Sequence, residues 1–125
     1  MKLSIENYSR EDLAWLAGFF EGEGSFRQSD RAYWEITQSS LEPLERGFSI
    51  FPVGKIYGPY ANKPGRQPYY RWVACKFEEV QAVVAATWPW LSRRRRDQYK
   101  SQLSKVQNKF KNSKYYAKHG RVIGA

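Results

Sequence analysis

Apolar residues recur with the period of an α-helix in four segments of the chain. The first segment, from about Arg10 to Glu23, has a capping-box serine before it at Ser9 and a suitable C-terminal cap after it at Gly24. The four apolar stripes are Leu13, Leu16 and Phe20; Leu41, Leu44, Phe48 and Phe51; Phe77, Val80, Val84, Thr87 and Leu91; and Tyr99, Leu103, Val106 and Phe110. Pro89 disturbs the third stripe. We therefore expect four helices.

Between the first and third helices the period changes to two, which is typical of strands. Residues 25–28 and 32–38 predict one hairpin with a turn at 29–31, and residues 55–58 and 69–74 predict a second, with a proline-containing loop over 59–68. Phe26, Trp34 and Ile36 are expected to face the core. The polar face and the first turn then carry Arg27, Arg31, Tyr33, Glu35, Lys55, Tyr57, Tyr69 and Arg71. Arginine beside aromatic side chains suits base edges and phosphates, so these eight residues are candidate DNA contacts. An ordinary solvated sheet face has the same pattern and is the alternative interpretation.

The first helix carries a second stripe made of small residues. Ala14, Gly18 and Gly22 recur at every fourth position and share one face. Each glycine costs a helix about 1 kcal/mol relative to alanine, so two within five residues indicate a packing requirement. Small residues at this spacing allow a second helix to approach closely. The pattern predicts a helix–helix contact through this face.

Two carboxylates lie in the last turn of the same helix. Glu21 and Glu23 are beside the negative end of the helix dipole, where an anionic side chain is disfavoured unless a cation compensates it. Carboxylate oxygens suit Mg²⁺, which binds one or two of them together with waters and phosphate oxygens. A solvated helix end with two surface glutamates is the alternative interpretation.

The net charge of +9 is concentrated at the C-terminal end. Residues 1–92 hold 10 Lys and Arg against 11 Asp and Glu, whereas residues 93–125 hold 11 against the single Asp97. This asymmetry indicates a polyanionic partner, with nucleic acid first and an anionic membrane second, or else a solvated basic tail. No helix pairs a wide apolar face with a clean basic one, which argues against membrane binding.

Length and composition define the remaining expectations. The 125 residues predict a single domain with its core over about 9–110 and a basic, flexible arm over about 111–125. No apolar run approaches the roughly 18 residues of a membrane span, and the N-terminus lacks the layout of a signal peptide, so a cytoplasmic protein is expected. The single cysteine, Cys75, and the single histidine, His119, offer little support for nucleophilic or histidine-based catalysis.

The segment from Leu16 to Gly24 resembles the nine-residue motif of the LAGLIDADG homing endonucleases. It matches at leucine, alanine, glycine and the final glycine, and it has an acid at both acidic positions. The resemblance implies an α+β fold with an αββαββα core, an antiparallel sheet that forms a DNA-binding saddle, and C-terminal helices. It also implies that Glu23 is a catalytic metal ligand and that Glu21 is structural. Both acids are glutamate here, which lengthens the reach to the metal by one methylene.

Two further positions take roles from the resemblance. Gln38 corresponds to a polar residue that orients a water at the metal, and Arg94 to a basic residue near the scissile phosphate. Arg93 and Arg95 remain alternatives to Arg94, and the whole run with Arg96 is expected to contact DNA.

The resemblance implies a homodimeric, site-specific double-strand DNA endonuclease encoded in a mobile intron or similar element. Mg²⁺ is the expected cofactor, with Mn²⁺ able to substitute, and the target is long and pseudo-palindromic. The compartment would be the cytoplasm, or an organellar matrix in a eukaryote. A protein with the same scaffold that binds DNA or intron RNA without cutting, as a maturase or regulator, is the competing hypothesis.

Overall fold

The computed structural model describes residues 8–27, 31–61 and 63–119, with residues 107–119 as backbone only. In chain order its elements are α1 (Arg10–Glu23), β1 (Gly24–Ser25), β2 (Trp34–Gln38), α2 (Leu41–Ile50), β3 (Lys55–Tyr60), β4 (Tyr69–Ala74), α3 (Phe77–Thr87), the 3₁₀ helix η2 (Trp88–Trp90) and α4 (Arg93–His119). The strands form one antiparallel sheet in the order β1-β2-β4-β3. This is the α+β class and the order of helices and hairpins that the sequence predicted.

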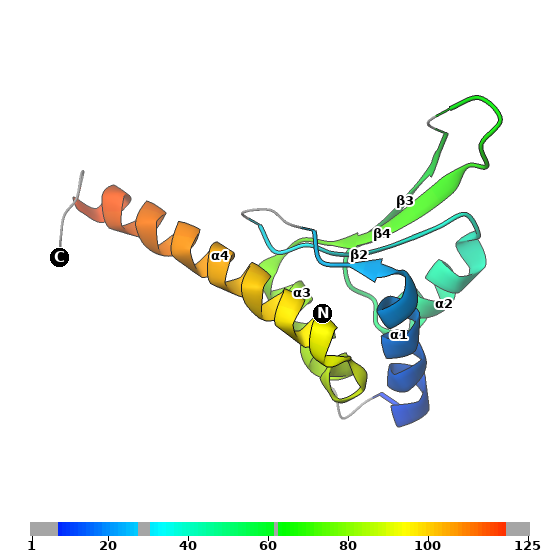
Figure 1. Cartoon of the computed structure of the whole chain (residues 1–125), viewed down its shortest axis with the longest axis horizontal. Helices are drawn as coiled ribbons and strands as arrows, with labels where there is room; N and C mark the ends of the chain where they lie inside the picture. Colours follow the sequence, from blue (N-terminus) through cyan, green and yellow to red (C-terminus); the bar gives the residue numbers. More distant parts are fainter. Residues whose placement is uncertain (1–7, 28–30, 62, 120–125) are drawn as a thin grey trace.

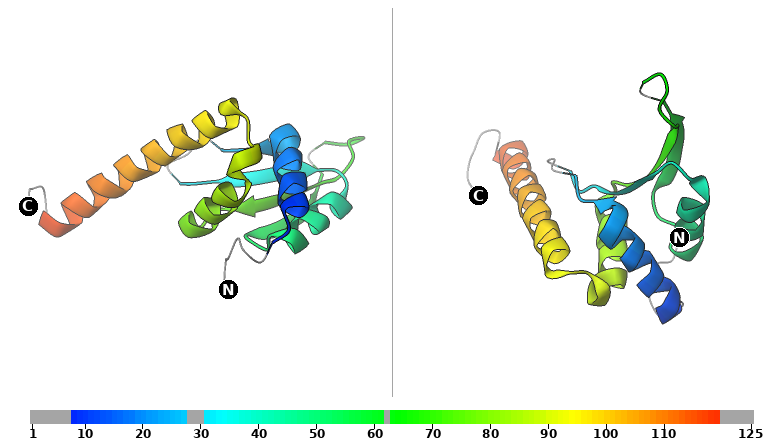
Figure 2. Two further views of the ribbon diagram at one scale, coloured as in Figure 1. Left: turned by 90° about the horizontal axis from the view of Figure 1, so that it is seen from below. Right: turned by 45° about the vertical axis from the view of Figure 1, so that its right-hand side comes forward.

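The helices are distributed unequally over the two faces of the sheet. Figures 1 and 2 show α1, α2 and α3 packed on one face, while no helix of the described chain covers the opposite face. The long helix α4 begins beside α1 and extends away from the body. The fold thus leaves an open sheet face, which we term the outer face.

Large aromatic side chains fill the space between the sheet and the helices. Trp34 and Trp72 meet edge to face with ring centroids 4.6 Å apart, and Phe20 of α1 stacks on Trp34 at 5.1 Å. Such pairs contribute roughly 0.5–1.5 kcal/mol each beyond the burial of their area. The inward positions predicted for Phe26, Trp34 and Ile36 are confirmed, since all three are buried.

The core also explains why α2 contains a glycine. A Cβ on Gly47 would lie 2.6 Å from Cζ3 of Trp72, closer than side-chain atoms approach one another. Gly47 therefore lets α2 lie directly on the buried indole, and a larger residue would push the helix off the sheet.

Several boundaries differ from the prediction, among them the end of β3, which extends to Tyr60. β1 contains only Gly24 and Ser25, and the turn expected at 29–31 lies mostly outside the described residues. The third helix ends at Thr87, whose hydroxyl donates to the backbone oxygen of Val83 at 2.8 Å. A 3₁₀ turn that contains Pro89, the residue expected to disturb the stripe, follows before Leu91. The basic run 93–96 forms the first turn of α4 instead of preceding it.

The C-terminal segment also differs from the prediction. The backbone of α4 is helical as far as His119, so the helix continues through most of the segment that was expected to be a flexible arm from about Lys111. The flexibility expected of that segment stays a prediction, and residues 120–125 lie outside the described chain. In the part of the chain that the structure describes, no helix has both the length and the apolar character needed to cross a membrane.

Candidate functional site

The end of α1 is fixed by a close contact between a glycine and an aromatic ring. The backbone N–H of Gly24 donates to the backbone oxygen of Phe20, and a Cβ at Gly24 would lie only 2.1 Å from Cδ1 of the Phe20 ring. Gly24 adopts an ordinary extended conformation, so the requirement for glycine is one of space. The helix therefore stops where the sequence predicted, immediately after Glu23.

Glu23 projects from this helix end into solvent. Its side chain is exposed, and it has no hydrogen bond or ion pair with any residue that the structure describes. The last turn of α1 itself contains no basic residue. A carboxylate in this position retains its full capacity to bind a cation.

The carboxylate of Glu21, two residues earlier, is half-buried and hydrogen-bonded to the start of α4. Its Oε1 accepts a hydrogen bond from the backbone N–H of Ser92 at 2.9 Å, and Ser92 Oγ accepts one from the backbone N–H of Arg95 at 3.2 Å. Ser92 thus caps the N-terminus of α4, and Glu21 satisfies the N–H of the capping residue itself. Glu21 therefore joins α1 to α4, in keeping with the structural role expected of it.

The environment of Glu21 favours its ionised form. Partial burial by itself raises the pKa of Glu21, but the hydrogen bonds from Ser92 and the charges of Arg95 and Arg94 outweigh it. The pKa consequently lies below its ordinary value of 4.5. Glu21 is an anion held at a helix N-terminus, where negative charge is favourable.

Arg95 completes this junction from the other side. Its Nη2 donates to the backbone oxygens of Glu21 at 3.0 Å and Gly24 at 2.8 Å, and its Nη1 donates to Gln98 at 3.1 Å. The guanidinium lies over the ring of Phe20 and the residue is only 6% exposed. Burial, together with the charge of Arg94, lowers the pKa of Arg95. Arg95 was predicted to contact DNA, but the structure places it inside the fold because it satisfies the carbonyl end of α1.

The other arginines of the run have different surroundings. Arg96 is half-buried and donates to the backbone oxygen of Trp88 at 2.8 Å, with its guanidinium over the Trp88 ring. Arg93 and Arg94 are exposed. Of the three candidates for the phosphate-binding arginine, Arg93 and Arg94 therefore remain available, at the end of α4 that contacts α1.

Gln38 is the last residue of β2 and lies towards the end of α1. Because Gly24 pairs with Ile36 in antiparallel register, the residues after Ile36 run back alongside the last residues of α1. By alternation Gln38 shares the helix-covered face with the buried Trp34 and Ile36, but it is only half-buried. The structure thus brings Gln38, Glu23 and the start of α4 to one end of the sheet.

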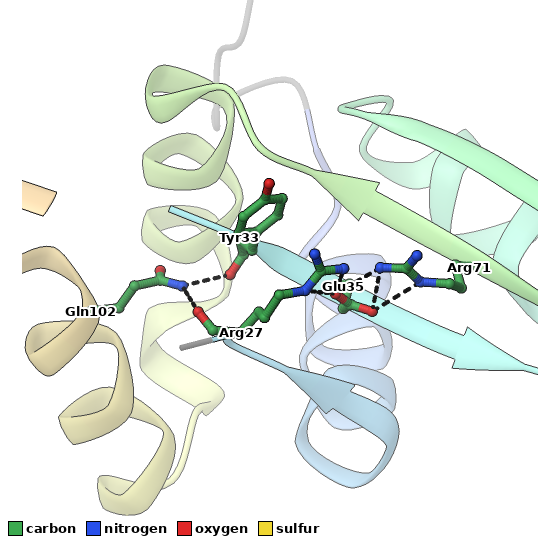
Figure 3. A network of polar contacts seen from close by, with 5 residues as sticks. All are labelled: Arg27, Tyr33, Glu35, Arg71 and Gln102. Atoms are coloured by element: carbon green, nitrogen blue, oxygen red, sulfur yellow. Dashed lines mark hydrogen bonds and ion pairs between the residues drawn. The ribbon is translucent and has the colours of Figure 1, made fainter. Parts of the chain in front are cut away.

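The outer face of the sheet is organised around a buried carboxylate (Figure 3). Glu35 on β2 accepts hydrogen bonds from Arg27 at 2.6 and 3.0 Å and from Arg71 on β4 at 3.1 to 3.2 Å. The guanidinium of Arg27 also lies 4.3 Å from the centre of the Tyr33 ring. Glu35 was predicted to contact DNA, yet the residue is only 9% exposed and its carboxylate is paired with two arginines. Its effect on this surface is therefore indirect, because it holds the Arg27 and Arg71 side chains in place.

A shallow hollow adjoins this network. Its volume is about 240 Å³ and its lining residues are Arg27, Tyr33, Tyr57, Tyr60, Arg71, Val73 and Cys75. Lys55 and Arg31 are exposed near its margins, and Tyr69 is half-buried against Tyr60 with ring centroids 5.4 Å apart. Tyr60 was not singled out in the sequence because the predicted strand ended before it.

The sequence also missed Gln102. Its Nε2 donates to the backbone oxygens of Arg27 and Tyr33, both at 2.9 Å, and the residue is 1% exposed (Figure 3). Gln102 follows Tyr99 at helical spacing, on the packed face of α4. This spacing is the sequence signal from which its burial could have been predicted. Through Gln102 the long helix supports the backbone that carries the Arg27 and Tyr33 side chains.

The small-residue face of α1 has no cover within the described chain. Gly18 and Gly22 are exposed, and a Cβ on either would meet no atom within 4 Å. Ala14 is half-buried, while Leu13, Leu16 and Phe20 on the opposite stripe are in the core as predicted. The contact predicted for Ala14, Gly18 and Gly22 is therefore not made within the described protomer.

Comparison with known proteins identifies the fold. No protein-family model and no curated protein sequence matches the chain. Among solved structures, the chain is similar to the LAGLIDADG meganuclease I-AabMI bound to uncleaved DNA, with 21% identity and a TM-score of 0.64 over 86% of this chain and 40% of that one. It is also similar to the group I intron-encoded homing endonuclease I-CeuI complexed with DNA, with 15% identity and a TM-score of 0.61 over 90% of this chain and 59% of that one.

A third similar structure is the homing endonuclease I-CvuI in complex with its target, with 18% identity and a TM-score of 0.56 over 87% of this chain and 75% of that one. The architecture is thus that of the homing endonucleases. More particularly, the chain has the LAGLIDADG homing-endonuclease fold, which confirms the resemblance of residues 16–24 at the level of structure.

Proposed function

We propose that the chain is a metal-dependent endonuclease that cuts double-stranded DNA at a specific site as a homodimer. The observation that carries this proposal is the exposed, unpaired carboxylate of Glu23 at the end of α1 in a LAGLIDADG fold. Two of the similar structures, those of I-CeuI and I-AabMI, are complexes with DNA, and the outer face of this chain carries paired arginines and tyrosines.

The residues at this helix end fit a hard divalent cation. Glu23 offers oxygen ligands without a competing protein partner, and Mg²⁺ needs only one or two carboxylates when phosphate oxygens and waters complete its shell. Mn²⁺ accepts the same donors and is expected to substitute. A cation held there would supply Lewis-acid assistance to phosphodiester hydrolysis.

The remaining roles belong to side chains of the same region. Gln38 would orient a water by hydrogen bonding, and Arg94 would offset the negative charge that develops on the phosphate. The outer face and the basic run would contact DNA through Arg27, Arg31, Tyr33, Lys55, Tyr57, Tyr69, Arg71, Arg93 and Arg96. Arg95 and Glu35 are removed from direct contact by their burial.

A second copy of the chain would complete the site. The uncovered face formed by Ala14, Gly18 and Gly22 leaves room for the same helix of a partner, related by a twofold axis. Two copies of Glu23 would then approach one another, which is favourable only when cations lie between them. Twofold symmetry of the protein implies a long target with pseudo-palindromic half-sites, and a mobile intron would be the coding context.

The second candidate is a protein that binds DNA or intron RNA without cutting it, for which the arginines and tyrosines of the outer face would suffice. A binding protein needs the outer face but has no use for Glu23.

The test is a selection from randomised duplex DNA. Duplexes bound in Ca²⁺ are recovered with the protein, the pool is transferred to Mg²⁺, and new DNA ends are sequenced, with Glu23→Gln in parallel. Paired cuts with a fixed stagger inside a pseudo-palindrome, absent in Glu23→Gln, are the expected result. Specific binding without new ends would establish the binding protein, and intron RNA would then be tested.

A further inference from the structure

We propose that Glu35 is a positioning residue that presents Arg27 and Arg71 as a pair of guanine-reading side chains on the outer face. The proposal deepens the proposed DNA-binding function and rests on it. It assigns the specificity of this part of the sheet to an arrangement of three residues, one of which never touches DNA.

The geometry depends on which edge of each guanidinium is occupied. Arg27 donates to Glu35 through Nε at 3.0 Å and Nη2 at 2.6 Å. Arg71 likewise donates through Nε at 3.2 Å and through Nη2 at 3.1 and 3.2 Å. Both arginines thus use the Nε–Nη2 edge, and neither Nη1 has a partner among the described residues.

The free Nη1–Nη2 edge is a fork of two parallel donors. Such a fork matches two adjacent acceptors, which guanine presents in the major groove as O6 and N7. Lysine has no equivalent, because its ammonium is a point charge without a planar edge. Two forks held by one carboxylate can therefore read two neighbouring guanines.

Glu35 fixes the two forks before DNA arrives. Its side chain is only 11% exposed, while those of Arg27 and Arg71 remain 41% and 28% exposed. Tyr33 stacks on the Arg27 guanidinium and fixes the plane of that group as well. Side chains that are already ordered lose less conformational entropy on binding, so the arrangement increases both affinity and discrimination.

The position in the sheet favours a base over a phosphate as the main ligand. Arg71 is on β4, one of the two central strands in the order β1-β2-β4-β3, whereas Arg27 follows the edge strand β1 and is bonded to Glu35 on the other central strand, β2. We expect a sheet that enters the major groove to present its central residues to base edges and its edge residues to the sugar–phosphate backbones. Lys55 on the edge strand β3 is then a matched residue that would contact phosphate.

The charge balance gives Glu35 a second effect. Two guanidiniums close to one carboxylate carry a net charge of +1, and the carboxylate suppresses the repulsion between them. Replacing Glu35 by glutamine removes that compensation and directs N–H donors at the arginines. We expect at least one guanidinium to leave its position and contact DNA less selectively.

The experiment measures base preference in duplexes selected by the wild-type protein in Ca²⁺, which requires no cleavage. The expected site has guanine at one or two adjacent positions of each half-site. A single 7-deazaguanine there, which lacks N7 but keeps O6, should remove part of the about 5- to 150-fold that a whole bidentate contact contributes to binding. A methylphosphonate at the neighbouring linkage should have a smaller effect.

The variants separate positioning from folding. Glu35→Gln is expected to lose most of the guanine preference at these positions and to keep the preferences elsewhere, a local change that general loss of structure would not produce. Should Glu35→Gln fail to fold, Arg71→Lys serves in its place and should lose the same preference. Lys55→Met is the control, because removing a phosphate contact should weaken binding to all sequences equally.

The outcomes distinguish this inference from the function on which it rests. Failure of the wild type to select any duplex sequence would overturn both. Selective binding without guanine at these positions, or an unchanged preference in folded Glu35→Gln and Arg71→Lys, would overturn the role of Glu35 alone. A larger effect of methylphosphonate than of 7-deazaguanine would also overturn it, because the forks would then bind phosphate.

Discussion

The carboxylate of Glu21 and the backbone N–H of Ser92 are joined by a hydrogen bond of 2.9 Å that connects the end of α1 to the start of α4. Arg95, in the first turn of α4, makes a second connection between the two helices by donating to the backbone oxygens of Glu21 and Gly24. Each charge thus faces the favourable end of the other helix, which offsets its unfavourable position in its own helix. The proposed reacting groups, Glu23 and Arg94, stand immediately beside this junction, which we term the α1–α4 clasp.

Glu21→Gln is expected to destabilise the fold without removing a metal ligand. The variant loses a charged acceptor at the clasp, and the half-buried position reduces the effect to about 1 kcal/mol. Urea unfolding at pH 7 measures it. The matched control is Glu23→Gln, which should keep its stability or gain slightly because it removes a negative charge from a helix C-terminus.

The contribution of Glu21 should also depend on pH in a defined direction. Because the pKa of Glu21 is lower in the folded chain than its ordinary 4.5, ionised Glu21 stabilises the fold fully above that value. The contribution is lost as the pH falls through the lower folded-state pKa. The difference in Tm between wild type and Glu21→Gln should therefore be constant near neutrality and shrink below about pH 4.5. A difference that grew on acidification would contradict the assigned ionisation.

The sequence predicted the parts of the molecule that depend on local periodicity. The stripe of Leu13, Leu16 and Phe20, the stop at Gly24 and the inward position of Trp34 all follow from spacing between near neighbours. The two hairpins were predicted for the same reason, although β1 is shorter than expected and contributes only two residues to the sheet.

Local periodicity could not predict the contacts between segments that are distant in sequence. Periodicity shows which face of a segment is packed, but it does not identify the partner, and Glu21 and Ser92 are 71 positions apart. Arg93 to Arg96 are four identical letters in sequence, yet Arg95 is buried and Arg94 is exposed because of their angular positions on α4. Glu35 was assigned to the correct face, but the two arginines that occupy it made its role indirect.

Arginines 94 and 95 should give opposite results when they are replaced. Arg95→Lys has a shorter side chain without the planar guanidinium, so it should not bond Glu21, Gly24 and Gln98 together, and we expect a loss of about 1–3 kcal/mol of stability. Arg94→Ala should change stability by less than about 0.5 kcal/mol, since its side chain is on the surface. Under the proposed function Arg94→Ala lowers the cleavage rate at saturating DNA. Equal stability of the two variants would show that the clasp does not contribute as described.

Gln102 should be among the most sensitive polar residues of α4. Gln102→Ala removes both donors to Arg27 and Tyr33 and leaves two backbone oxygens without their partner, at an expected cost of about 2–4 kcal/mol. Thermal unfolding measures it. Ser101→Ala, on the exposed side of the same helix, is the control and should be close to wild type. Comparable losses in both variants would point to helix propensity instead of docking.

The uncovered face of α1 predicts that one substitution can prevent dimer formation without lowering the stability of the fold. A side chain at Gly18 meets open space in the described protomer, so Gly18→Leu should preserve or raise the stability of the helix, by up to about 1 kcal/mol. The same side chain would prevent close approach of a second α1. Sedimentation equilibrium is expected to show a dimer for the wild type, a monomer for Gly18→Leu, and a dimer for Ala85→Leu, which enlarges an exposed position on α3. A wild-type protein that remains monomeric with and without DNA would exclude the twofold site, whereas a Gly18→Leu dimer would place the interface elsewhere.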